Sequence, residues 1–295
     1  MIGLGSQYLT AAGFGRYRIT AASLGNLDLL GLGWLKAPAR QAIIGAFGDD
    51  GMAVINATNE YLNGIAASDR DKATALAGFI NEDPMMVCSL GLEPQLTVLP
   101  KMPWRWIKGD SVSYFDLGFK PYDDMCVRTF ALRRGGGCII GSRIGNANNI
   151  FVIADDAQSY NRVRFDAWNY SSFTYNNNVY TKWRILTNDL IHGKCMFDNT
   201  VVATFNRSHY TNALNLFVLA CNNNGTAQHW DDKHPQFAYI DFENTSGGLD
   251  HRIAPYKGNK LIDIIEARVI ENAGGGTLEY GYVLPDGTPW TPSTP

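Results

Sequence analysis

The chain has 295 residues, of which 45% are hydrophobic, so it can bury the core of one large β domain or of two smaller domains. Its formal net charge is −3, and its 25 lysines and arginines are scattered rather than gathered in a basic stripe. These totals argue against a nucleic-acid partner, and charged residues and proline interrupt every apolar run before the ~20 residues that a membrane span needs.

The N-terminal region, residues 1–103, is rich in alanine, glycine and leucine. Apolar residues at near-helical spacing predict helices over 51–66 and 69–81, with Ser68 or Asp69 as an N-cap of the second. An ordinary helical subdomain accounts for this pattern. A region whose small apolar residues pack against other subunits accounts for it too, and the sequence leaves both alternatives open.

From Trp104 onward the composition shifts to aromatic and β-branched residues, with asparagine and glycine at turn spacing. The alternation in NRVRFDAW places Val163, Phe165 and Ala167 on one face of a half-buried strand. Repeated short strands separated by turn signals favour a mainly β fold, an antiparallel jelly-roll β-sandwich over residues 104–283.

Two segments within this region carry more specific signals. Asp198 and Asn199 separate two short apolar runs, and such a pair tolerates the positive φ of a tight β-hairpin turn. Residues 213–225, ALNLFVLACNNNG, predict one nearly continuous apolar strand that ends at the asparagines.

The last apolar strand, LIDII, contains an aspartate and is followed by Asn-Ala-Gly-Gly-Gly. A buried carboxylate needs hydrogen-bond donors, and backbone N–H groups of a glycine turn can supply them. We therefore expect a structural clasp built from Asp263, Asn272, Gly274 and Gly276. The functional alternative is that Asp263 is a catalytic or calcium-binding carboxylate.

The cysteines and the first residues bear on where the protein matures, and the last residues bear on where the β region ends. Five cysteines form an odd number without any CxxC pair, so we expect reduced, mostly buried thiols. The first residues lack a signal-peptide pattern, which favours maturation in a cytoplasm. Residues 284–295 carry four prolines and are expected to form an extended C-terminal tail.

Six parts of the β region follow one another in a recognisable order, and they are SYFDLGFKP, CIIGSRIGNANNIFVI, TKWRIL with KCMFDNTVVATF, LNLFVLACNNNGT, FAYIDFENTSGGLDHRIAPY, and LIDII with ENAGGGTLEYG. This order resembles the concanavalin A-like lectin/glucanase superfamily, in particular the laminin-G-like jelly rolls of phage virion proteins and gut-bacterial surface proteins. The resemblance covers roughly residues 105–283. It implies a jelly-roll sandwich in which Trp183 points inward.

Laminarinase-type members of that superfamily carry Glu-x-Asp-x-x-Glu on one strand. Here Leu261 stands in place of the first glutamate, followed by Asp263 and Glu266. Residues three apart on a strand point to opposite faces, whereas a retaining hydrolase needs two carboxyl groups about 5 Å apart. We therefore expect a protein that is not an enzyme, with an atypical glycoside hydrolase as the remaining catalytic alternative.

Aromatic and amide side chains suggest a carbohydrate site. Sugars are bound by aromatic faces and by planar amides or carboxylates. Two loops offer these groups, and their candidate residues are Trp168, Tyr170, Asn176 and Asn177 in the first loop and Asn223 and Trp230 in the second. The site forms if the loops meet at one rim of the sandwich; otherwise these residues decorate loops and the tryptophans pack on neighbours.

The resemblance implies a phage virion protein, a fibre or decoration subunit made in the host cytoplasm. Its N-terminal region would bind other virion proteins, its sandwich would contact a host-surface glycan or protein, and it would form a homo-oligomer. The alternative is a bacterial carbohydrate-binding lectin. No cofactor or metal is expected, although paired acids in turns leave a bound calcium ion open, and the closest histidine pair, His229 and His234, fits a polar surface loop.

Overall fold

The computed structural model describes residues 33–92, 102–132, 137–144, 150–155, 162–167, 169–174, 182–205, 213–229 and 235–293. Residues 150, 155, 162–167 and 169–174 are described by their backbone alone. The chain divides into a helical unit (Met1–Val87, Gly91–Pro100 and Pro292–Pro295) and a β unit (Cys88–Leu90 and Lys101–Thr291). The protein is mainly β, with a smaller helical region before the β-sandwich.

The helical elements are α2 (Ala37–Phe47), η2 (Gly48–Asp50), α3 (Gly51–Ala66), α4 (Arg70–Glu82) and η3 (Pro84–Ser89). The helices predicted over 51–66 and 69–81 are confirmed as α3 and α4. Asp69 caps α4, because its side chain accepts the backbone N–H of Lys72 at 2.9 Å. In the described part of the chain, no helix is both long and apolar enough to cross a membrane.

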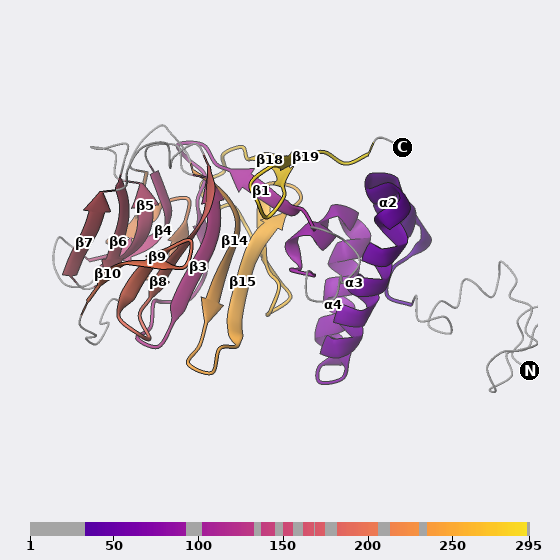
Figure 1. The fold of residues 1–295 in the computed structure, drawn as a ribbon, viewed down its shortest axis with the longest axis horizontal. Helices are drawn as coiled ribbons and strands as arrows, with labels where there is room; N and C mark the ends of the chain where they lie inside the picture. The colour runs from indigo at the N-terminus through magenta and orange to yellow at the C-terminus, as the bar shows by residue number, and fades with distance from the viewer. Residues whose placement is uncertain are drawn as a thin grey trace, which may run out of the picture. The chain divides into compact units, whose positions relative to one another are not determined.

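The larger sheet, sheet A, has eleven strands among the described residues and is antiparallel. Its main order is β10 (Thr200–Thr204), β9 (Lys194–Phe197), β8 (Trp183–Asp189), β3 (Cys126–Leu132), β14 (Gln236–Glu243), β1 (Trp104–Lys108), β18 (Glu279–Val283) and β19 (Pro289–Trp290). The remaining strands, β15 (Leu249–Tyr256), β16 (Lys260–Asp263) and β17 (Arg268–Ile270), continue from β14. Figure 1 shows β3, β14 and β15 side by side.

The second sheet, sheet B, has eight strands in the described ranges. Its main order is β13 (Thr226–Gln228), β12 (Cys221–Asn223), β4 (Gly137–Arg143), β5 (Ile150–Asp155), β6 (Arg162–Ala167) and β7 (Asn169–Thr174). Two short strands, β2 (Phe115–Asp116) and β11 (Phe217–Val218), pair with each other, and β11 also pairs with β4.

The two sheets pack face to face around one apolar core. Sheet A contributes Val127, Leu186 and Phe237, and sheet B contributes Phe151 and Ile153, all fully buried. Burying each such side chain contributes about 1.5–3 kcal/mol to stability. The predicted β-sandwich is therefore the observed fold, with alternate residues of each strand directed away from this core.

The predicted hairpin at Asp198 and Asn199 is confirmed. These residues have φ of 46° and 66°, and they join β9 to β10. Asp198 also closes the turn onto β8, because its carboxylate accepts the N–H of Ile185 and binds Arg184.

The single strand predicted over 213–225 is wrong. The chain breaks at Leu219, whose φ is 64°, and the two pieces pair with β4 in opposite directions. The first piece, β11, runs antiparallel to β4, whereas the second, β12, runs parallel to it. The apolar run is continuous because both pieces are buried, and hydropathy alone does not report the change of direction.

All five cysteines are free and buried, as expected. Burial, with Asp189 and Glu243 nearby, raises the pKa of the Cys126 thiol to about 12. This thiol is therefore protonated and unreactive at neutral pH. Part of the expected tail is a strand, since Pro289 and Trp290 form β19 on the edge of sheet A.

Candidate functional site

The sequence-predicted sugar residues lie mostly outside the described part of the chain, and these are Trp168, Asn176, Asn177 and Trp230. Asn223 is the half-buried last residue of β12, and the backbone of Tyr170 lies in β7. Three strands, β4, β5 and β6, separate β12 from β7. At about 4.8 Å per strand, Asn223 and Tyr170 are about 19 Å apart across sheet B, so one small sugar does not reach both.

The expected clasp is two separate structures. Asp263 is fully buried at the end of β16. Its carboxylate accepts backbone N–H groups of Ile265 and Glu266 and lies 2.7 Å from Nδ1 of His251. The expectation that the glycine turn supplies its donors is therefore wrong. The chain turns immediately after Asp263, which brings the N–H groups of its own turn within reach.

The glycine turn instead binds the segment 110–114. The side-chain oxygen of Asn272 accepts the N–H of Tyr114, Gly274 and Gly275. A Cβ on Gly274 or on Gly276 would overlap Val112 or Asp110, respectively, at well under 3.0 Å. Asn272, Gly274 and Gly276 thus hold two distant segments together, and only glycine fits at the contact.

Asp110 completes this turn. Its carboxylate accepts the N–H of Thr277 at 2.7 Å and the N–H groups of Val112 and Ser113. Desolvation by burial raises the pKa of Asp110, but these hydrogen bonds outweigh it and lower the pKa to about 2. The carboxylate is therefore ionised throughout the physiological range.

Asp263 and Glu266 do not have the geometry of a catalytic carboxylate pair. Glu266 is exposed in the turn after β16, whereas both oxygens of the buried Asp263 are occupied. Among the residues that the structure describes, no group of three or more His, Cys, Asp or Glu side chains could hold a metal ion.

The outer face of sheet A, directed away from the core, carries an aromatic cluster. Trp104, Phe130 and Tyr239 are buried in it, and Trp106 and Trp183 pack against it half-buried. Ring centroids are 4.6 Å apart for Trp104 and Tyr239 and 5.1 Å apart for Phe130 and Trp183. The expectation that Trp183 points inward is wrong, because strand alternation places it with this outer cluster while Leu186 enters the core.

Trp106 and Trp183 form a tilted pair at the edge of this cluster. Their ring centroids are 6.4 Å apart and their planes meet at 46°. Trp106 lies against the backbone of Gly281, and the Cβ of Trp183 lies 3.3 Å from the Cβ position of Gly287 in the β18–β19 turn. Backbone contacts therefore fix both rings while part of each remains open to solvent.

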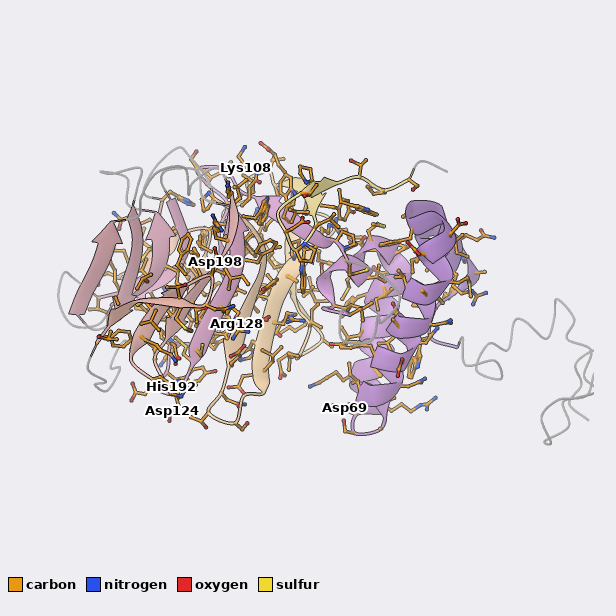
Figure 2. All side chains as sticks on the ribbon, in the orientation of Figure 1. Asp69, Lys108, Asp124, Arg128, His192 and Asp198 are labelled. Atoms are coloured by element: carbon orange, nitrogen blue, oxygen red, sulfur yellow. The ribbon has the colours of Figure 1, made fainter. Side chains whose placement is uncertain are left out.

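Polar groups lie next to this pair in one cross-strand row. Lys108 pairs with Gln236, Gln236 with Leu132, and Leu132 with Trp183. Directly opposed residues share a face of a sheet, so all four project outward. Figure 2 shows Lys108 at the end of sheet A away from His192 and Asp124.

Gln236 is the most distinctive member of the row. The residue is only 5% exposed, yet its amide makes no hydrogen bond to any residue that the structure describes. The ammonium of Lys108 lies 2.7 Å from the carboxylate of Glu279. We call Trp106, Trp183, Gln236 and Lys108 the tryptophan site.

Two charged pairs lie elsewhere on the outer face of sheet A. Arg252 binds both oxygens of Asp241 at 2.7 Å and lies over the rings of Trp104 and Tyr239. Arg128 binds Glu243, whose pKa is raised above its usual value, chiefly by burial. These groups are already partnered, so their role is structural.

The sequence reasoning missed the tryptophan site, although one signal was present. In WRWIK, period-2 alternation puts Trp104, Trp106 and Lys108 on the same face. A strand that directs two indoles and an ammonium away from its core-facing isoleucine, Ile107, is a candidate binding face.

Comparison with known proteins finds weak similarity to solved structures. No protein-family model matches the sequence. No curated protein matches it either. Among solved structures, the chain is similar to a proposed carbohydrate binding protein from Bacteroides ovatus, at 10% identity and a TM-score of 0.43, covering 60% of each chain. It is also similar to domains LG4-5 of the mouse laminin alpha1 chain, at 12% identity and a TM-score of 0.38, covering 60% of this chain and 47% of that one. The chain thus spans less than two thirds of either protein, and at these TM-scores neither likeness decides what it binds.

Proposed function

We propose that this chain is a non-catalytic carbohydrate-binding protein that binds sugar at the tryptophan site. The observation that carries the proposal is the tilted pair of Trp106 and Trp183 on the same face as the amide of Gln236, which bonds to none of the described residues. This proposal corresponds to the lectin alternative from the sequence analysis rather than to the hypothesis of a phage virion protein.

The chemistry of the site suits a pyranose ring. The C–H face of a sugar packs on an indole, which offers a large apolar surface at a low entropic cost. A primary amide can donate to one hydroxyl and accept from its neighbour. Gln236 holds such an amide within a largely buried residue, so little side-chain freedom remains to be lost when a sugar binds.

The arrangement offers no support for glycoside hydrolysis at this site. The carboxylate that adjoins it, Glu279, is bound to Lys108, and its side chain is 63% exposed. A general acid needs a raised pKa and a second carboxylate across the scissile bond. A binding role without catalysis uses every feature of the site, whereas hydrolysis requires features that the described residues do not supply.

A glycan array probed with the full chain tests the proposal. Saturable binding that is lost in Trp183→Ala and in Gln236→Leu supports it. Trp290→Ala is the matched control, because Trp290 in β19 packs edge-on against Tyr282 in β18, outside the tryptophan site. Its loss should leave glycan binding unchanged.

The same array distinguishes the two candidate faces. Binding that survives Trp183→Ala but is lost in Trp168→Ala or Trp230→Ala would place the site on the sequence-predicted loops instead. Absence of binding to every glycan would contradict the proposed function.

The remaining expectations stay predictions. A place in a phage particle, attachment to other virion proteins through residues 1–103 and a homo-oligomeric state each concern partners, and no described contact bears on them. Lectin activity is compatible with such a particle, since host attachment through surface glycans uses the same chemistry.

A further inference from the structure

We propose that the saccharide bound at the tryptophan site carries a carboxylate, so that its ligand is a uronic-acid-containing glycan. This inference rests on the proposed function and names its ligand class. It follows from the balance of hydrogen-bond donors and acceptors that line the site.

The polar groups of the tryptophan site are mainly donors. Trp106 and Trp183 each carry an indole N–H, and neither makes a hydrogen bond to a described residue. Gln236 adds an amide with two N–H donors and one acceptor oxygen, and Lys108 adds an ammonium with three donors. A ligand that satisfies this lining must supply more acceptors than donors. A sugar hydroxyl brings one donor with its two acceptor lone pairs, whereas a carboxylate is acceptor-only and offers about four lone-pair sites.

The ammonium of Lys108 can accept a new partner at little cost. Its ion pair with Glu279 joins side chains that are 27% and 63% exposed, and ion pairs between exposed groups are weak because water and salt screen them. A ligand carboxylate can therefore replace Glu279. Gln236 lies directly opposite Lys108 on β14, so the same carboxylate can also receive the amide N–H.

Neighbouring acids do not oppose this binding strongly. Glu279 is displaced when the ligand binds Lys108, but its side chain is 63% exposed, so water and salt screen its repulsion of the ligand. The carboxylate of Asp286, in the β18–β19 turn, accepts the N–H of Thr288, and Asp198 is paired with Arg184. These two carboxylates keep their donors, which reduces their repulsion of an incoming anion.

Affinity electrophoresis and calorimetry with the full chain test the inference. The probes are polygalacturonate, alginate and hyaluronan, each compared with its carboxyl-reduced form, which keeps the sugar backbone and removes the charge. Polyglutamate serves as a polyanion without sugar. We expect at least one acidic polymer to bind about tenfold more tightly than its reduced form, the factor that a lost charge-assisted contact typically costs.

Variants separate the contributions within the site. Lys108→Met should remove the preference for the acidic polymer while the reduced polymer still binds, and Glu279→Gln should strengthen acidic binding because the competing carboxylate is gone. Trp183→Ala should abolish binding of both forms. Circular dichroism of each variant confirms that the sandwich is folded.

The outcomes distinguish the two proposals. Equal or tighter binding of the reduced polymers, or binding of neutral glycans only, overturns the uronic-acid inference and leaves the carbohydrate function standing. Binding of polyglutamate as tight as that of the acidic polymers overturns both, because charge without sugar would suffice. No binding to any saccharide also overturns both.

Discussion

The indole of Trp106 rests on the backbone of Gly281, so closely that a Cβ at position 281 would fall under 3.0 Å from three atoms of the ring. Gly281 pairs directly with Trp106 across β1 and β18. We expect Gly281→Ala to displace the indole, to weaken glycan binding, and to lower the free energy of unfolding by about 1–3 kcal/mol, the range for overpacking. Urea unfolding and the glycan array measure the two effects.

Gly78→Ala is the control for this variant, since nothing lies within 4 Å of its Cβ position and alanine favours a helix. A Gly281→Ala protein with unchanged binding would contradict the assigned position of the ring.

The glycine turn predicts a sharp contrast between adjacent residues. A Cβ on Gly274 would overlap the carbonyl of Val112, whereas nothing lies within 4 Å of the Cβ position of Gly275. We expect Gly274→Ala to prevent folding or to cost more than about 4 kcal/mol, as backbone overlap at a special position does. Gly275→Ala should cost only about 1–2 kcal/mol, because its φ of 72° is unfavourable for alanine. Similar unfolding midpoints for the two variants in urea would contradict the clasp.

Asp110 predicts a pH dependence. Its pKa in the folded chain is lowered to about 2 from a usual value of 3.8, so the ionised form stabilises the fold. This contribution is complete above about pH 4 and is lost as the pH falls through the folded pKa. Asp110→Asn should therefore be less stable than the parent near pH 7, and the difference should shrink towards pH 2. Unfolding curves at both pH values measure it, and a difference that does not depend on pH would rule out an electrostatic role.

The pair of Asp241 and Arg252 is largely buried, with side-chain exposures of 5% and 16%. Arg252→Met leaves the Asp241 carboxylate without its main partner, and we expect a loss of about 3–5 kcal/mol. The double variant Asp241→Asn with Arg252→Met should recover part of that loss, since no buried charge remains. A double-mutant cycle by guanidinium unfolding gives the coupling energy, and strictly additive losses would show that the two charges act independently.

Local signals in the sequence predicted much of the fold. The strand at NRVRFDAW, the Asp198–Asn199 turn and the N-cap of α4 each depend on a few neighbouring residues, and each is found in the structure. The faces of that strand lie outside what the structure describes. The tryptophan site depends instead on the register among β1, β14, β3 and β8, strands that are far apart in the chain. A single sequence does not reveal that register, so Gln236 could not be placed beside Lys108.

Two of the three wrong expectations, the strand over 213–225 and the donors of Asp263, have local physical reasons. Leu219 adopts a left-handed φ, and nothing in a buried, apolar segment signals such a conformation. The apolar run therefore predicts one continuous strand where the chain changes direction. Asp263 was assigned to distant donors because its own turn, over Ile265 and Glu266, carries none of the usual turn residues except the aspartate itself.

The pairing of β1 with β18 determines how the sandwich would respond to a pulling force. Trp104, where β1 begins, is directly opposite Val283, where β18 ends, so the chain enters and leaves this ladder at the same end. A force applied between Trp104 and Val283 loads the antiparallel hydrogen bonds one after another rather than all together. This ladder would then open bond by bond from that end at low force, although β1 remains paired with β14 and the core is extensive.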